Sequence, residues 1–356
     1  MPLLPAQHHP RRQRRASGAD HPQRADIALA AGDDQGALPC RPMTVPQFGI
    51  FAQGTIAHEF IEFDLRADVD IGLATAALSQ LRAPAVSAGG VNLVIGFGSE
   101  LWRTVAPEHA PEGMALFTPI GRLGGHHAPA TQHDFWLWIN GSSQDVVFEH
   151  SRAAVRMLAD VAVVASEQPC FVHRDSRDLT GFIDGSANPM THEAPGVALV
   201  PDGQPGAGGA HVLVMRWIHD LDAFEKLEVQ EQQRVVGRTK PLSVELTGDA
   251  LPPDAHIARV QITDQAGDEI PIYRRSVPYG TVAEHGLYFV AFSADRSRFD
   301  RMLSRMFGTD ADRVHDRLTD FSRPVSGSFY FAPSLSVLAE LAERWGAPTE
   351  SPAASE

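Results

Sequence analysis

The chain has very little cysteine: two residues among 356, Cys40 and Cys170. Two cysteines cannot build a disulfide framework, and they are too few for a zinc or iron–sulfur site made of thiolates. Sparse cysteine is typical of proteins in a reducing compartment, so we expect a cytoplasmic location. Sixteen histidines contrast with this scarcity, and an imidazole ligand for a cofactor could be among them.

Long apolar runs and excess positive charge are missing as well. No apolar run approaches the ~18 residues that span a bilayer, so we expect no membrane partner. The net charge of −14, from 30 basic and 44 acidic residues, disfavours nucleic acid as the main partner. The sequence contains no Gly-rich phosphate loop with Lys, no HExxH motif and no Gly-x-Ser-x-Gly nucleophile elbow. With 43% hydrophobic residues, it still predicts one large or two ordinary globular domains.

Both ends of the chain have the composition of tails. Residues 1–45 are rich in Pro, Ala, Gly, Arg and Asp and show no helix or strand period. Four arginines between Arg11 and Arg15 resemble a twin-arginine start, but no apolar segment of the required 7–15 residues follows them. We therefore predict a disordered tail over 1–45, with Met43 as an alternative start, and a second tail over 346–356.

The rest of the chain consists of two halves with one order of elements, β-α-β-β-α-β. Split βαβ units with antiparallel sheets form ferredoxin-like α+β domains. We predict two of them, over 46–195 and 196–345, joined near residues 190–205. The expected elements are strand 61–65, helix 70–81, strands 91–97 and 134–139, a helix after Ser143 and strand 161–165 in the first half, and strand 211–217, helix 227–236, strands 257–262, 273–277 and 286–292, helix 298–307 and strand 328–332 in the second.

The most unusual segment runs from Arg177 to Pro189, where Gly181 and Gly185 flank Asp184. Glycine permits positive φ and a close approach of the backbone to a flat ligand. An acid held in such a segment can serve as a general base. On spacing alone, an Asx turn between two domains is the more common explanation of such a segment.

Two further candidates lie in the second half. His256 precedes the expected strand 257–262, and imidazole is a common metal ligand, although a lone histidine before a strand is more often a capping or surface residue. Arg274 and Arg275 are adjacent on an expected strand and so point to opposite faces. One of them can face the interior, where it needs an anionic partner; two exposed arginines on an edge strand are the alternative.

Together these segments resemble the dye-decolorizing peroxidase (Dyp-type) family of haem enzymes, over roughly residues 46–340. Residues 177–185 match its Gly-Phe-x-Asp-Gly signature, with Arg-Asp-Leu before it and Asn188-Pro189 after it. Gly-Arg-Thr-Lys at 237–240, Tyr-Gly at 279–280, and Val-Ser-Gly with Phe-Ala-Pro-Ser between 325 and 334 match in the same order. The compact bacterial subgroup is the most similar. The resemblance implies a pair of ferredoxin-like domains, with one haem b per chain bound mainly by the C-terminal domain.

The resemblance also implies roles for individual residues. His256 resembles the proximal ligand of the haem iron, Asp184 the distal acid and Arg274 the distal arginine. The other implied cofactor-binding residues are Arg238 at a haem propionate, Leu287 and Phe289 on the apolar distal wall, Gly185 of the signature, Ser276 near the distal arginine, and Asp316 as the carboxylate bonded to the second nitrogen of His256. Asp320 competes with Asp316 for the last role, and Ser276 stands where many relatives have Asn.

These residues imply a haem peroxidase. Such an enzyme uses hydrogen peroxide to oxidise dyes, phenolics or porphyrinogens in one-electron steps, and its expected partners are peroxide and a small aromatic or porphyrin-type reductant. The alternative is a protein that handles haem or porphyrin, by iron release or porphyrinogen oxidation. A homo-oligomer is left open by the sequence.

Overall fold

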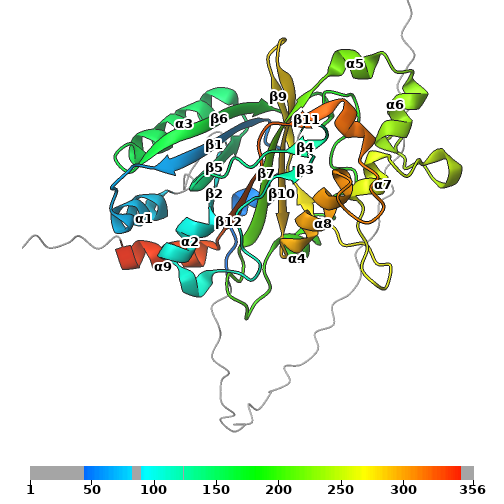
Figure 1. Cartoon of the computed structure of the whole chain (residues 1–356). Helices are drawn as coiled ribbons and strands as arrows, with labels where there is room; N and C mark the ends of the chain where they lie inside the picture. Colours follow the sequence, from blue (N-terminus) through cyan, green and yellow to red (C-terminus); the bar gives the residue numbers. More distant parts are fainter. Residues whose placement is uncertain (1–43, 82–89, 123, 346–356) are drawn as a thin grey trace, which may run out of the picture. The chain divides into compact units, whose positions relative to one another are not determined.

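The structure, a computed structural model, describes residues 44–81, 90–122 and 124–345 (Figure 1). Most of the two predicted tails lies outside these ranges: residues 1–43 at the N-terminus, with the alternative start at Met43, and residues 346–356 at the C-terminus. Thr44 and Val45, which were expected to belong to the N-terminal tail, bond to the folded chain. The Thr44 hydroxyl donates to Asp202 at 2.8 Å, and the Val45 amide donates to the Ser336 hydroxyl at 3.2 Å.

The first half forms a four-stranded antiparallel sheet in the order β6-β1-β5-β2. In chain order this is the 4-1-3-2 arrangement that a β-α-β-β-α-β unit produces when both of its helices cover one face. The carboxylate of Asp70 accepts from the Leu73 amide and caps the first helix. The elements are β1 Ala57–Leu65, α1 Ile71–Gln80, β2 Asn92–Phe97, β5 Phe135–Gly141, α3 Gln144–Leu158 and β6 Ala162–Phe171.

The second half repeats this order with β12-β7-β10-β8, again 4-1-3-2. Two short strands extend it, since β9 also pairs with β10 and β11 pairs with β7. The strands are β7 Ala210–His219, β8 Tyr273–Arg274, β9 Val277–Gly280, β10 His285–Ser293, β11 Ser322–Pro324 and β12 Ser328–Ala332, and the main helices are α6 Val229–Val236 and α8 Ser297–Met306.

The two halves share one ten-stranded sheet, because β12 pairs with β2 where Phe331 lies opposite Phe97. The sheet also curls, so that Phe60 of β1 stacks on Tyr288 of β10 with ring centroids 4.1 Å apart. The predicted α+β class with antiparallel pairing is confirmed. The division at 195/196 stays a prediction, since one sheet runs through both halves.

Helices cover the outer faces of this sheet. In Figure 1, α1 and α3 lie beside the first half and α8 beside the second. The last helix, α9 Leu335–Trp345, packs on α1, so the end of the described chain closes the core of the first half. The second half has its own core, in which Phe299, Met302 and Leu303 of α8 pack against Leu213 and Met215 of β7.

One expected strand is wrong: residues 257–262 begin with a helix, α7 His256–Val260. The run Ile-Ala-Arg-Val suits a short helix as well as an alternating strand. The contacts of Arg259 favour the helix over the strand. Its side chain is 2% exposed, and its guanidinium pairs with Asp312 at 2.7 Å and with Asp310 at 3.3 Å. The expected strand 273–277 is divided into β8 and β9.

Several short elements have no counterpart among the expectations. They connect the main strands and helices and were too short for a periodic pattern to reveal. They are α2 Ser99–Val105, β3 Ile120–Gly121, β4 His127–Ala128, α4 Ala194–Ala198, α5 Leu221–Glu225, and the 3₁₀ turns η1 Phe48–Phe51, η2 Pro107–His109, η3 Gly248–Ala250 and η4 Arg317–Asp320.

Candidate active site

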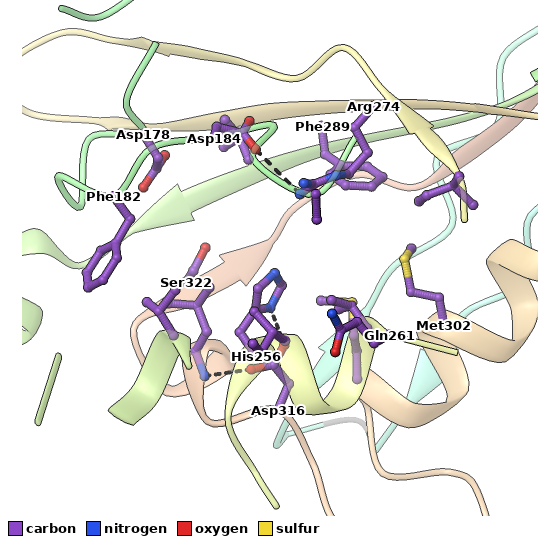
Figure 2. Close-up of a pocket in the computed structure, with 18 of the residues that line it drawn as sticks. Asp178, Phe182, Asp184, His256, Gln261, Arg274, Phe289, Met302, Asp316 and Ser322 are labelled. Atoms are coloured by element: carbon purple, nitrogen blue, oxygen red, sulfur yellow. Dashed lines mark hydrogen bonds and ion pairs between the residues drawn. The ribbon is translucent and has the colours of Figure 1, made fainter. Parts of the chain in front are cut away.

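A large cavity lies in the second half of the chain, between α7 on one side and the segment 178–187 on the other (Figure 2). It contains about 1480 Å³ of space free of protein atoms, part of which is open to solvent. Its walls include strand β10 and helix α8. Seven of the nine residues proposed from the sequence as site residues line it: His256, Asp316, Asp184, Arg274, Leu287, Phe289 and Arg238.

His256 is the first residue of α7 and stands on one side of the cavity. Its Nδ1 lies 2.6 Å from Oδ2 of Asp316, whose side chain is fully buried, and its other ring nitrogen points into the cavity (Figure 2). The second carboxylate oxygen of Asp316 accepts from the Leu318 amide at 2.9 Å. A buried carboxylate on Nδ1 fixes the tautomer and leaves Nε2 as a free lone pair. Asp320, the competing carboxylate, lies instead beside His126 and His315.

Asp184 and Arg274 face His256 from the opposite side (Figure 2). One guanidinium nitrogen of Arg274 lies 3.4 Å from Oδ1 of Asp184. Asn188 holds the two segments together: its side-chain amide donates to the Arg274 carbonyl at 2.8 Å, and its oxygen accepts from the Arg274 amide at 3.0 Å. The anionic partner that an inward-facing arginine requires is therefore Asp184. The sequence argument gave Asn188 no role, because its two bonds are made to a segment 86 residues away.

Arg275 points to the opposite face of the strand, as alternation requires. It is not solvated there. Its guanidinium donates to the Ile50 carbonyl at 3.0 Å and lies 5.2 Å from the ring centre of Trp138. The alternative of two exposed arginines is therefore wrong for both residues.

The backbone of the signature segment depends on glycine at two places. Gly181 has φ +89° and Gly185 has φ +77°. A Cβ on Gly181 would also come within 2.7 Å of the Lys240 side chain. Between them, the Asp184 amide donates to the Ser176 carbonyl at 2.9 Å, and Asp184 Oδ1 accepts from the Gly185 amide at 2.6 Å. The loop thus holds the Asp184 carboxylate in one orientation.

Two stretches of this chain match models of one protein family. Residues 47–172 match the Dyp-type peroxidase N-terminal model, and residues 175–337 match the Dyp-type peroxidase C-terminal model. The chain belongs to the Dyp-type peroxidase family. It is therefore a peroxidase, as the signature segment and the residues around this cavity led us to expect.

Individual relatives agree with this membership. The chain is 36% identical over 258 residues to a dye-decolorizing peroxidase of Rhodococcus erythropolis, which covers 71% of this chain and 75% of that one. A solved structure of a DypB variant from Rhodococcus jostii RHA1 in complex with heme has 34% identity and a TM-score of 0.75, and covers 85% of this chain and 98% of that one. A dye-decolorizing protein from V. cholerae has 32% identity and a TM-score of 0.73, over 84% and 97%.

The cavity has the features that a haem requires in a Dyp-type peroxidase. The free Nε2 of His256 is a neutral nitrogen that could bind a haem iron. Leu287 and Phe289, two residues apart on one face of β10, provide an apolar wall. Arg238 provides a positive charge at its edge, where its guanidinium also contacts the Ser243 carbonyl at 2.8 Å and Glu245 at 3.0 Å. These donors and walls fit a flat, largely apolar ring with carboxylate substituents.

Gly185 and Ser276, two of the residues expected to bind the cofactor, are not in the wall of this cavity. They line a neighbouring cavity, which shares Asp184 and Arg274 with the first. The Ser276 hydroxyl accepts from the Val290 amide at 3.4 Å and so contributes to strand pairing. In this Dyp-type peroxidase the two residues are better placed to act on access to Asp184 and Arg274 than on the cofactor itself.

His219 and Asp178 form a second pair in the cavity wall. His219 Nε2 lies 3.0 Å from Asp178 Oδ1, and its Nδ1 lies 2.7 Å from the Ser322 hydroxyl. Burial opposes the charge of Asp178, but the charge and hydrogen bond of His219, with bonds from Thr180, lower the pKa of Asp178 well below its usual range. Because both nitrogens of His219 are engaged, it offers no lone pair to a metal.

Within residues 44–81, 90–122 and 124–345, the structure contains no helix with the length and apolarity needed to cross a membrane.

Proposed function

We propose that one haem b binds in the cavity between His256 and the Asp184–Arg274 pair. His256 supplies Nε2 to the iron, and hydrogen peroxide reacts on the opposite side. One observation carries this proposal: a buried carboxylate orients an imidazole into an apolar cavity, and an acid and an arginine face that imidazole from the other wall. The heme in the structure of the R. jostii DypB variant supports it.

When bound, the haem would supply the redox chemistry, in which peroxide is the oxidant and the reductant gives up electrons one at a time. Asp184 accepts the proton of one peroxide oxygen and delivers it to the other, so that cleavage of the O–O bond releases water. Arg274 keeps its charge at every working pH and donates hydrogen bonds to the negative charge that develops on the leaving oxygen. Asp316 accepts from His256 Nδ1 and makes Nε2 a stronger donor.

The reductant is a small aromatic or porphyrin-type molecule, such as a dye, a phenol or a porphyrinogen. A role in haem or porphyrin handling is the second candidate. The ion pair of Asp184 and Arg274 at 3.4 Å favours the peroxidase, because carriage of a porphyrin requires neither a proton shuttle nor a charge that stabilises a leaving oxygen.

Two further parts of the proposal concern the surroundings of the protein. A cytoplasmic location is supported by the scarce cysteine and by the free, buried state of Cys170, whose thiol pKa is raised by burial. Self-association into a homo-oligomer is compatible with a chain of this kind, and light scattering would measure it.

The test is an absorption spectrum of the purified protein together with peroxide-dependent oxidation of a dye. We expect a Soret band in the wild type and its loss or displacement in His256→Ala. His285→Ala is the matched control, because His285 lies on β10 away from the cavity wall and bonds to the Thr281 carbonyl. An unchanged spectrum in His256→Ala would overturn the ligand assignment, and a haem-containing protein without dye turnover would favour porphyrin handling.

A further inference from the structure

Two histidines and an aspartate meet outside the haem cavity. His126 lies in the turn between β3 and β4, His315 lies after α8, and Asp320 ends η4. One nitrogen of each imidazole and one oxygen of Asp320 lie within 4.8 Å of one another. None of the three side chains lines the cavity of His256. The imidazole rings are stacked, with centroids 3.8 Å apart and planes at 19°.

Two of the three separations between ligand atoms match those of a tetrahedral metal site, and the stacked rings would have to spread to bring both nitrogens onto one ion. Zinc binds imidazole nitrogen and carboxylate oxygen at about 2.0–2.1 Å, which places neighbouring ligand atoms of a tetrahedron about 3.3–3.4 Å apart. Nε2 of His126 lies 3.4 Å from Oδ1 of Asp320, and Nε2 of His315 lies 3.3 Å from the same oxygen. Both imidazoles therefore direct their Nε2 toward one carboxylate oxygen at the separation that a shared cation requires.

The hydrogen bonds of Thr319 show which nitrogen of His126 carries the proton. The Thr319 hydroxyl donates its single hydrogen to the Asp316 carbonyl at 2.6 Å. Nδ1 of His126 lies 2.8 Å from the same hydroxyl oxygen, so Nδ1 must be the donor of that bond. Nε2 of a neutral His126 is then a bare lone pair that faces the Asp320 carboxylate, and two acceptors 3.4 Å apart repel unless a cation lies between them.

Protonation of both imidazoles is an unfavourable way to provide that cation, because two charged rings stacked 3.8 Å apart repel each other. A bound metal ion satisfies both nitrogens and the carboxylate at once.

We propose that His126, His315 and Asp320 bind one divalent cation of borderline softness, of which Zn²⁺ is the probe of choice. Two imidazoles and one carboxylate are a ligand set typical of zinc, with a water molecule in the fourth position. The site lies apart from the haem and goes beyond the peroxidase function. It fastens the β3–β4 turn of the first half to η4, the segment that begins at Asp316.

The second group of this kind on the described chain is a poor site for a cation. His109 lies with Glu108 and Glu340 on the surface. However, the Arg344 guanidinium already donates hydrogen bonds to both carboxylates, to Glu340 at 2.8 Å and to Glu108 at 2.6 Å. The positive charge of Arg344 already neutralises these carboxylates, so we expect no metal ion to bind beside His109. A change at His109 is therefore a matched control.

The experiment is a calorimetric titration of the untagged haem-containing protein with Zn²⁺, after dialysis against a chelator and its removal. We expect a site of one Zn²⁺ per chain that His315→Gln and Asp320→Asn each weaken by more than about 100-fold, since loss of even an outer partner costs 10–100-fold. His109→Gln should bind Zn²⁺ like the wild type. Zn²⁺ should also raise the thermal midpoint of the wild type but not of Asp320→Asn.

Three results would overturn the proposal. The wild type could bind no Zn²⁺, which would show that His126, His315 and Asp320 form only a hydrogen-bonded cluster. Binding could survive in both His315→Gln and Asp320→Asn, or it could be lost in His109→Gln instead. The Soret band, recorded on every variant, keeps a lost metal site distinct from a lost haem.

Discussion

At the scale of single residues, chemistry depends on pairs that face each other across the cavity. Asp184 and Arg274 are an ion pair, so a change in either one also changes the surroundings of the other. Loss of one oxyanion-type donor costs about 10²–10³ in rate, and loss of acid–base assistance costs about 10²–10⁴. The ranges overlap, and the comparison of both variants decides between them.

We expect Arg274→Leu to slow the reaction with peroxide more than Asp184→Asn does at neutral pH. The guanidinium is always charged, whereas water can substitute for the carboxylate in moving a proton. Asp184→Asn should instead flatten the dependence of the rate on acidic pH. Stopped-flow mixing with peroxide, followed at the Soret band, measures both. Arg323→Leu, at an exposed arginine of β11, is the control, and a slower Asp184→Asn would reverse the two roles.

Asp316 has a separate, electronic effect through His256. The 2.6 Å bond from Nδ1 to a fully buried carboxylate increases electron donation by Nε2. We expect Asp316→Asn to retain haem and to raise the reduction potential of the iron. A spectroelectrochemical titration measures the potential, with Asp70→Asn, at the cap of α1, as the control. A potential equal to that of the wild type would show that Asp316 is only structural.

At the scale of elements, the site depends on how short segments are held against the sheet. Helix α7 has only five residues, too few to be stable alone, and it is positioned by contacts at both ends. Arg259 anchors one end through Asp310 and Asp312. At the other end, Ile257 packs against Gly237, the residue that ends α6 with φ +88°.

Gly237→Ala should therefore disturb both stability and the haem site. A Cβ there would lie 2.6 Å from the Ile257 side chain, and the left-handed backbone adds its own strain. We expect the free energy of unfolding to fall by about 2–4 kcal/mol. The strained backbone accounts for about 1–2 kcal/mol of this loss, and overpacking accounts for the rest. We also expect the haem to dissociate faster. Denaturant titration and transfer of haem to apomyoglobin measure these quantities.

Gly203→Ala is the matched control for that prediction. Gly203 also has positive φ, at +85°, but no atom lies within 4 Å of its Cβ position. The free energy of unfolding of Gly203→Ala should fall by only about 1–2 kcal/mol, and this variant should release haem at the rate of the wild type. Equal haem release from the two variants would contradict a link from Gly237 to α7.

At the scale of the whole molecule, the closely packed sheet buries titratable groups that do not line the cavity of His256. Burial lowers the pKa of His58 and of His211 to about 4 each, with help from the charges of nearby arginines. Burial raises the pKa of Glu59 to about 8. These groups link the stability of the fold to pH in opposite directions.

We expect the free energy of unfolding to fall as pH decreases from about 6.5 to 4.5. In that interval the unfolded chain binds a proton at His58 and at His211 while the folded chain binds neither, which destabilises the fold. Glu59 acts in the opposite sense, because the folded chain keeps a proton that the unfolded chain gives up above about pH 4.5. Taken alone, His58, His211 and Glu59 leave two protons against one, a net loss of at most about 1.4 kcal/mol per pH unit. The lowered pKa of His126 adds to the histidine side, and the raised pKa of Glu62 adds to the side of Glu59.

Denaturant titrations between pH 7 and pH 4.5 measure this slope, with haem release followed separately. His211→Gln removes one of the histidine contributions and should reduce the slope by up to about 1.4 kcal/mol per pH unit, whatever it does to stability at pH 7. An unchanged slope in His211→Gln would show that other groups set the pH dependence.

The order of elements was predictable from the sequence because both halves have long, strongly patterned strands. The periodicity of segments such as 91–97 and 286–292 is local, and so is the glycine pattern around Asp184. Where a segment was short, the prediction was wrong: residues 256–260 form helix α7, and Arg259 in this helix makes ion pairs with residues more than 50 positions away.

The sequence by itself determined the fold class, the family and the residue types of the site. Only the tertiary structure decided how they meet. It placed Asp316 rather than Asp320 on His256, joined Asp184 to Arg274 through Asn188, and left Ser276 in a neighbouring cavity. The physical reason is that each of these contacts joins segments 60 or more residues apart, so their geometry depends on the pairing of strands and not on any local pattern.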